Sequence, residues 1–284
     1  FPDNRSFEVF AGNSITFDRD KWELGANGRI QVPYIFNPGL NSKAHFAVNS
    51  AADFLARWTC IDLNKRKKER RYIRFIRGDG CSSRIGRGFG VQDIHLAFGC
   101  EHRGIVLHEV FHAIGFYHEQ ARPDRDRYIE VFLNNVYPRH RHNYHKMNPA
   151  NVANLGFGYD LRSFLHYESH AFQKDQISPT FIVRSTGLPM YLAANNPSDI
   201  DIAEVDTLYR CPIKAADRRG SWGPWKAWSA CYDGCSSIKI TKIRYRFCKN
   251  ARGGHATSCP GSNTNSGICK RKIYACKPKY SQWT

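Results

Sequence analysis

The spacing of the histidines in residues 105–119, IVLHEVFHAIGFYHE, constrains this chain more than any other feature of its sequence. Apolar residues recur at helical spacing through the segment, which predicts a helix. His108 and His112 are four residues apart, so both imidazoles leave one face of that helix, about one turn apart. Glycine adopts the left-handed backbone conformation at little energetic cost, so Gly115 can end the helix and turn the chain. This turn brings His118 back toward the pair. We therefore expect three imidazole nitrogens around one metal ion.

Three protein ligands leave one position open for water, which is typical of a catalytic rather than a structural zinc site. Glu109 follows the first ligand and is placed to act on that water as a general base. The alternative is a helix with incidental histidines on a solvated face, but the glycine in register makes the full HExxHxxGxxH pattern far more restrictive than HExxH alone. A second cluster, RHRHNYH at residues 139–145, lies among basic residues. We interpret it as a solvated basic loop rather than another metal site.

The histidine segment resembles the signature HExxHxxGFxHE of the astacin family of zinc endopeptidases, and Phe116 and Glu119 complete the match. A second segment, RPDRDRYI (Arg122–Ile129), is similar to another motif of that family. The resemblance extends from Trp22 to Cys211. It implies an α+β zincin-like (metzincin) catalytic domain with an active-site cleft and one Zn2+ ion.

The chain departs from the family at the motif called the Met-turn. Residues 159–167 read YDLRSFLHY, and Leu165 stands where the family has a methionine beneath the zinc ligands. Leucine is apolar and of similar volume, and such exchanges usually cost less than about 1.5 kcal/mol, so we expect an intact site. The resemblance places Tyr167 where the family has a tyrosine that can ligate zinc and then stabilise the transition state. The alternative for Tyr167 is a packed core tyrosine.

The resemblance implies a mechanism for hydrolysing peptide bonds of proteins or peptides. Glu109 would take a proton from the attacking water and pass it to the leaving amine. The Tyr167 hydroxyl, together with the metal, would stabilise the oxyanion that forms in the transition state.

Ten cysteines and a net charge of +17 are unevenly divided along the chain. Residues 215–284 carry 14 basic and two acidic residues, a net +12, and six of the cysteines. Six cysteines in so short a stretch indicate a disulfide framework, because a small domain buries too little apolar surface to be stable alone. Zinc is the rival interpretation, but no CxxC pair is present. We expect pairing within this domain among Cys231, Cys235, Cys248, Cys259, Cys269 and Cys276.

The four remaining cysteines allow three connectivities from spacing alone. The family resemblance implies Cys60–Cys211 and Cys81–Cys100.

The basic C-terminal part carries an aromatic and cationic pattern. Three tryptophans are spaced three residues apart: Trp222, Trp225 and Trp228. In a later strand-like segment every second residue is a cation: Lys242, Arg244 and Arg246. These cations would share one face of the strand, where they can stack on the indole rings. The pattern resembles the thrombospondin type 1 repeat, a three-stranded β module, over Ser221–Cys276. A generic disulfide-rich module is the alternative. The expected units are therefore residues 1–21 (an N-terminal segment or prosegment remnant), 22–211 (peptidase), 212–220 (linker) and 221–284 (thrombospondin type 1-like).

The cysteine framework favours an oxidising, extracellular compartment, so we expect a secreted protein and no nucleic-acid partner. No run approaches the ~18 apolar residues of a membrane span. A sulfated glycan or an acidic matrix protein fits the basic module, which would then concentrate the protease on extracellular or matrix substrates. The rival hypothesis is a catalytically silent adhesive or decoy protein that keeps the zinc scaffold.

The segment FAGN (Phe10–Asn13) has asparagine where the family's propeptide motif FxGD has the aspartate that blocks the zinc. We interpret it as a prosegment remnant or a chance match, and favour chance. In matured members of the family the new N-terminal amine reaches the residue that corresponds to Glu119. The sequence alone does not identify the residue that supplies this amine.

The rest of the first domain provides a scaffold. Residues 44–58 have amphipathic-helix spacing, with Phe46, Val48, Ala52, Leu55 and Trp58 as its apolar residues. Strands are expected within residues 29–36, 72–80 and 93–98. The basic run KRKKERR at residues 65–71 is interpreted as a solvated hairpin or loop rather than a binding site.

Overall fold

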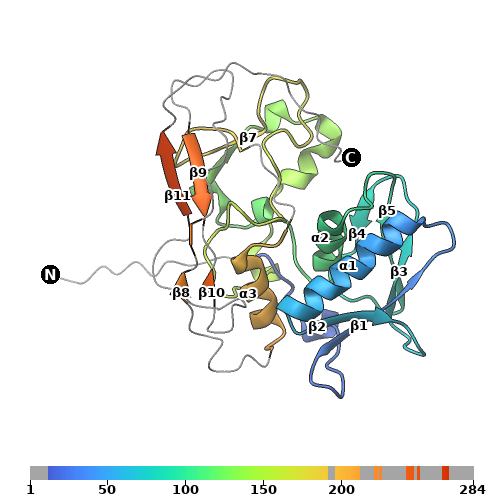
Figure 1. Ribbon diagram of the computed structural model, residues 1–284. Coiled ribbons are helices and arrows are strands. Elements are labelled where there is room, and N and C mark those ends of the chain that lie inside the picture. The colour runs from blue at the N-terminus through green and yellow to red at the C-terminus, as the bar shows by residue number, and fades with distance from the viewer. Residues whose placement is uncertain are drawn as a thin grey trace.

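The computed structural model describes residues 12–190 and 196–211, Pro224 and Trp225, and the backbone of four short strands nearer the C-terminus. A five-stranded sheet of order β2-β1-β3-β5-β4 forms the first half of the catalytic region (Figure 1). Its strands β1, β2, β3 and β5 are parallel, and the edge strand β4 is antiparallel to β5. Their bounds are β1 Ile30–Phe36, β2 Ile61–Lys65, β3 Tyr72–Ile76, β4 Cys81–Ser83 and β5 Val91–Leu96. The three predicted strand segments are thus confirmed, and residues 66–71 connect β2 to β3 as a loop.

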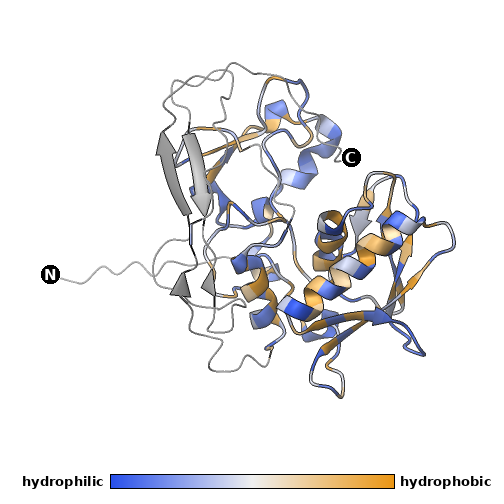
Figure 2. Ribbon diagram, in the orientation of Figure 1, coloured by the Kyte–Doolittle hydropathy of each residue, from blue (hydrophilic) through white to orange (hydrophobic). Residues whose placement is uncertain are grey.

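Helix α1 (Ser42–Trp58) confirms the predicted amphipathic helix and, except for Phe46, its predicted apolar face. Asn41 caps it by accepting a hydrogen bond from the Ala44 amide. The buried stripe consists mostly of small side chains at helical spacing: Ala44, Ala47, Val48, Ala51 and Leu55. Phe46, expected on the apolar face, is 76% exposed because it lies outside that stripe. The alanines allow α1 to pack closely against α2 (Arg103–Ala113) and strand β2 of the sheet. In Figure 2 parts of the α1 and α2 ribbons are orange, the colour of hydrophobic residues.

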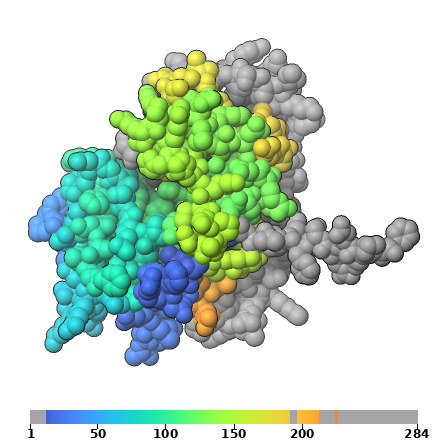
Figure 3. Space-filling model, turned by 180° about the vertical axis from the view of Figure 1, so that it is seen from behind, coloured from blue at the N-terminus to red at the C-terminus, as the bar shows by residue number. Residues whose placement is uncertain are grey.

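The chain after α2 is largely irregular. In Figure 1 the sheet and α1 (blue to cyan) lie on one side of α2, and the later segments (green to yellow) lie on the other. Figure 3 shows the same two parts side by side from behind. The later part has a small antiparallel pair, β6 (Ile129–Val131) with β7 (Phe181–Val183), and the C-terminal helix α3 (Asp199–Leu208). Short 3-10 helices are η1 Asp18–Asp20, η2 Glu119–Ala121, η3 Arg125–Arg127, η4 Leu133–Asn135, η5 Pro138–Tyr144 and η6 Pro149–Asn151.

Two disulfides join distant parts of this domain, and they are the pairings that the family resemblance implies. Cys60, just after α1, is bonded to Cys211, just after α3. Cys81 in β4 is bonded to Cys100 in the loop after β5. The first closes a loop with a sequence separation of 151 residues, so it ties the sheet half to the end of the second half.

Beyond residue 211 the structure describes two antiparallel strand pairs. They are β8 (Ser221–Trp222) with β10 (Cys248–Lys249), and β9 (Thr241–Tyr245) with β11 (Thr264–Ile268). The six C-terminal cysteines and the three cations predicted to stack on indoles have side chains outside the described residues. No helix in the described parts of the chain is long and apolar enough to span a membrane.

Candidate active site

Helix α2 and the turn after it bring the three predicted ligands together. The Nε2 atoms of His108 and His112 are 3.1 Å apart, and each lies 3.2 Å from Nε2 of His118. Gly115 makes this return possible, with a φ of +110° that side chains rarely adopt. A Cβ there would lie 2.6 Å from Cδ1 of Ile15, so the position also lacks room for a side chain.

Backbone carbonyls orient two of these rings. Nδ1 of His108 donates to the Phe164 carbonyl at 2.9 Å, and Nδ1 of His112 donates to the Phe116 carbonyl at 2.7 Å. With the proton on Nδ1, each Nε2 presents its lone pair to the centre of the triad. Burial lowers the pKa of His108 to about 3 and that of His112 to about 4, so both rings are neutral near pH 7. Neutral imidazole is the form that binds metal.

The donor set fits zinc. Lone pairs of neutral nitrogens facing one another at 3.1–3.2 Å repel unless a cation lies between them. A tetrahedral ion with Zn–N bonds of about 2.0–2.1 Å would hold neighbouring nitrogens about 3.3 Å apart, close to these separations. Within the described residues, no other group of histidines, cysteines and carboxylates is arranged to hold a metal. The histidines of the basic segment 139–145 do not form a second site there.

Glu109 lies on α2 with its carboxyl group buried. Glu109 is only 3% exposed, and its Oε2 has no hydrogen-bond partner among the described residues. Burial raises the pKa of Glu109 to about 8. A cation held by the histidines would favour the ionised form instead.

Tyr167 and Leu165 both lie at the triad. The Tyr167 ring is 4.5 Å from the His118 ring between centroids, and its amide donates to Gln120 Oε1 at 3.1 Å. Burial raises the pKa of the Tyr167 phenol, which stays protonated at neutral pH. Leu165 is fully buried in the main core, and its carbonyl accepts the Glu119 amide at 3.1 Å. Leucine at this position is therefore accommodated within a packed core.

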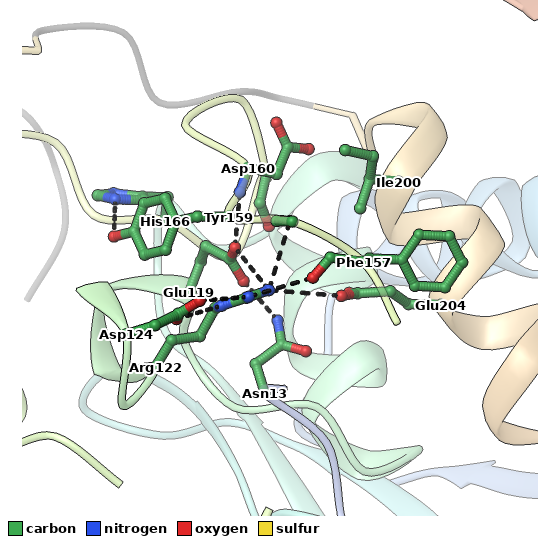
Figure 4. Close-up of polar contacts among 12 residues, drawn as sticks. Asn13, Glu119, Arg122, Asp124, Phe157, Tyr159, Asp160, His166, Ile200 and Glu204 are labelled. Carbon is green, nitrogen blue, oxygen red and sulfur yellow. Dashed lines mark hydrogen bonds and ion pairs between the residues drawn. The ribbon is translucent and has the colours of Figure 1, made fainter. Parts of the chain in front are cut away.

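Glu119 is the centre of a buried polar cluster that sequence reasoning did not anticipate (Figure 4). Its Oε2 accepts a hydrogen bond from Nδ2 of Asn13 at 2.7 Å, and its Oε1 accepts one from the backbone amide of Asp160 at 2.7 Å. Asn13 thus lies against Glu119, and Tyr117 donates its amide to the Asn13 carbonyl at 2.7 Å. The backbone of residues 13–15 is therefore part of the domain's packing, which a motif comparison with FxGD does not reveal.

Arg122 supplies the positive charge of this cluster. Its side chain is fully buried, and Nη1 lies 3.4 Å from Glu119 and 4.0 Å from Glu204. It also makes a bidentate contact to Asp124, with 3.0 Å for both bonds. Burial raises the pKa of both Glu119 and Glu204. The cluster joins the end of the zinc-site turn to α3.

Asp160 and Asp201 extend the cluster to the cap of α3. Ser198 Oγ donates to Asp160 at 2.5 Å, and Ser163 Oγ donates to Asp201 at 2.6 Å. Ser198 and Asp201 form a reciprocal capping box at the start of α3. The box S-D-I-D at residues 198–201 is a visible helix-start signal, but nothing in the sequence places it beside residues 160–163.

Comparisons with known proteins agree with this geometry. Residues 17–210 match the family model of astacin, which describes a family of peptidases. The chain is 32% identical over 215 residues to zinc metalloproteinase nas-15 of Caenorhabditis elegans, covering 73% of this chain and 37% of that protein. It is 30% identical over 206 residues to nas-6 of the same organism, covering 72% of this chain and 58% of that protein. The chain therefore spans less than two thirds of the length of these curated relatives.

A solved structure has the same fold. High choriolytic enzyme 1, a hatching-enzyme zinc protease of the medaka Oryzias latipes, is 29% identical with a TM-score of 0.66, and the match covers 70% of this chain and all of that one. The residues matched by the family model include the three converging histidines and the sheet that supports them. This chain belongs to the astacin family of zinc metalloendopeptidases, with an α+β metzincin catalytic domain and a three-histidine zinc site.

Proposed function

We propose that the chain is an active zinc endopeptidase that hydrolyses peptide bonds of extracellular or matrix proteins. The observation that carries this proposal is the buried Oε2 of Glu109, which has no partner in the described part of the chain, on the helix that carries two of three convergent, neutral imidazoles. A buried carboxylate oxygen without a partner is costly in a merely structural role, whereas a general base needs it free.

The residues of the site have distinct parts in the proposed reaction. A bound zinc ion supplies Lewis acidity, which polarises the scissile carbonyl and lowers the pKa of water at the site toward about 7. Glu109 accepts the proton of the attacking water and delivers it to the leaving amine. Tyr167 donates its hydroxyl proton in a hydrogen bond to the oxygen on which negative charge develops. The protonated phenol and its position against His118 support this role.

Glu109→Gln tests the proposal against the silent adhesive alternative. The variant keeps the size and burial of the side chain but removes the basic oxygen, so zinc should stay bound at one per chain while cleavage of a generic protein falls by about 10²–10⁴-fold. Glu130→Gln, on the partly exposed strand β6, is the matched control and should cleave like the parent. Equal cleavage by Glu109→Gln and the parent would remove the proposed role of Glu109. A zinc-loaded parent without activity would favour the silent scaffold.

We further propose that the mature enzyme begins at Asn13. The α-amine of Asn13 would then be the N-terminal amine that, by the family resemblance, reaches Glu119. Asn13 is fully buried, its Nδ2 already contacts Glu119, and its Oδ1 has no partner among the described residues. Arg122 is surrounded by more buried carboxylates than its single charge can balance, so an added cation at residue 13 would stabilise the cluster. Intact mass and N-terminal sequencing of the secreted protein test this. A mature N-terminus at any residue other than Asn13 would contradict it.

We propose that residues 221–284 form a thrombospondin type 1-like module, joined by residues 212–220 to the peptidase domain at 22–211, and that the protein is secreted. The two disulfides of the catalytic domain and the six further cysteines support an oxidising compartment. The net +12 of residues 215–284 supports a sulfated glycan or acidic matrix protein as partner. Heparin affinity of the full chain and of a chain ending at Cys211 tests the targeting role. Equal salt elution of the two would contradict it.

A further inference from the structure

Aromatic rings lead from the metal site outward through Tyr167. Its ring centroid is 4.5 Å from that of His118 and 5.6 Å from that of Phe172. Phe172 in turn stacks on His140 with a centroid distance of 4.4 Å and an interplanar angle of 28°. Tyr144 contacts Tyr167 edge-on at 5.8 Å. Phe172 thus contacts the side chain that the proposed reaction uses, although it is five residues further along the chain.

The backbone of Phe172 is in an unfavourable conformation. Its φ is +56°, and Phe172 and Arg210 are the only non-glycine residues with positive φ in the described part of the chain. For a bulky side chain this left-handed conformation costs about 1–3 kcal/mol, which glycine would avoid. Such strain persists only where the surrounding structure holds it in place. A phenylalanine at a position suited to glycine therefore needs a compensating contact of its ring.

Hydrogen bonds fix the strained turn from both sides. The Tyr137 amide donates to the Phe172 carbonyl at 2.9 Å, and the Tyr144 hydroxyl donates to the Ala171 carbonyl at 2.7 Å. Within the turn, Gln173 donates its amide to the His170 carbonyl at 3.2 Å. Because these bonds hold the backbone, the direction in which the Phe172 side chain leaves it is set, and that direction carries the ring to Tyr167.

We propose that Phe172 is a positioning residue that holds the Tyr167 ring beside His118. The inference rests on the proposed function of Tyr167 as donor to the developing oxyanion. Aromatic contacts at these separations are worth about 0.5–1.5 kcal/mol beyond the area that they bury. Tyr167 is only partly buried and its hydroxyl has no hydrogen bond to the described residues, so ring contacts and its backbone fix its place. Removing the Phe172 ring would let the phenol leave the position that the reaction needs.

The test is a double-mutant cycle with zinc content and melting temperature measured for each variant. Phe172→Ala and Phe172→Gly should each lower kcat by about 2- to 13-fold, the fold-change that corresponds to the free energy of the lost ring contact, with a smaller change in KM. Phe172→Tyr keeps an aromatic ring at this position and should have the same kcat as the parent. Phe172→Gly also relieves the backbone strain, so it should melt higher than Phe172→Ala although its kcat falls equally. Phe98→Ala removes a phenylalanine that is 83% exposed and should leave kcat unchanged.

The Tyr167→Phe background separates the inference from the function on which it rests. If Phe172 acts through the phenol, Phe172→Ala should cause no further loss of kcat once the hydroxyl is gone. An equal fractional loss in both backgrounds, or a kcat of Phe172→Ala within about twofold of the parent, would overturn the positioning role alone. A Tyr167→Phe variant as fast as the parent would overturn the proposed function of Tyr167, and the positioning role with it.

Discussion

Replacing Gly115 by alanine should damage the metal site by two effects that the structure separates. The first is backbone strain, because φ is +110° and an L side chain in this region costs about 1–2 kcal/mol. The second is a steric clash, because the added Cβ would lie 2.6 Å from Cδ1 and 2.7 Å from Cγ1 of Ile15. Ile15 is buried in the main core, so relieving the clash requires overpacking shifts of about 1–3 kcal/mol. The expected loss in the free energy of unfolding is about 2–5 kcal/mol.

Gly28→Ala is the matched control, because Gly28 also has a positive φ, +74°, but no atom lies within 4 Å of the added Cβ. It should show the strain alone. In a domain of this size each kcal/mol shifts the melting temperature by roughly 2–4 °C, so Gly115→Ala should melt about 4–20 °C below the parent and clearly below Gly28→Ala.

The assay is thermal melting of both variants together with zinc content after dialysis against a weak chelator. Since Gly115 turns the chain toward His118, Gly115→Ala should also lose zinc, whereas Gly28→Ala should keep it. Equal melting temperatures of the two variants would show that the clash with Ile15 has no effect on stability. Full zinc retention by Gly115→Ala would show that the turn at residue 115 is not needed to place His118. Either result would refute the reasoning.

Three further predictions concern the metal, a disulfide and a buried acid. Chelation should abolish cleavage and lower the melting temperature, and added Zn2+ should restore both; unchanged melting after verified zinc loss would contradict the fit of the histidines. Replacing Cys60 and Cys211 by serine should cost about 5 kcal/mol by the loop-entropy relation for a separation of 151 residues, measured by urea unfolding. Burial raises the pKa of Asp201 from 3.8 to about 7, so its contribution to stability is full below pH 3.8 and is lost as pH rises through 7. The Asp201→Asn variant should therefore be less stable than the parent at pH 5, and this difference in the free energy of unfolding should become smaller as the pH rises to 8. A difference that stays constant with pH in urea unfolding would contradict the prediction.

Local signals in the sequence were sufficient for the metal ligands and most of the first half of the fold. The i, i+4 spacing of His108 and His112 defines one helix face, and the glycine requirement at residue 115 follows from the turn that brings in His118. Strand patterns and the α1 helix were likewise local. Phe46 shows the limit, because which side of α1 is buried depends on how closely its alanines pack against α2 and the sheet. Hydrophobicity alone favoured the large side chain.

The polar partners of the site could not be predicted, because they come from segments distant in sequence. Phe164, which orients His108, is 56 residues away, and Asn13 is 106 residues from Glu119. These contacts depend on tertiary packing, for which a single sequence has no periodic signal. The family resemblance identified Glu119 as a partner of an amine, yet the buried carboxylates Asp160 and Glu204 around it carry no motif of their own.

If the mature enzyme begins at Asn13, as proposed, processing at the N-terminus would act on the geometry of the metal site through Glu119. Glu119 directly follows the third ligand, its amide is held by Leu165, and its two carboxylate oxygens are held by Asn13 and Asp160. A change in charge at residue 13 therefore acts on a side chain that is bonded at once to the ligand turn and to the segment carrying Tyr167. Because the cluster is fully buried, that charge is poorly screened by solvent, and its effect does not decay as it would at the surface. Glu119 follows His118, and its carboxylate is bonded to Asp160 in the segment that carries Tyr167, so the proposed change of charge at residue 13 would act on the surroundings of both side chains.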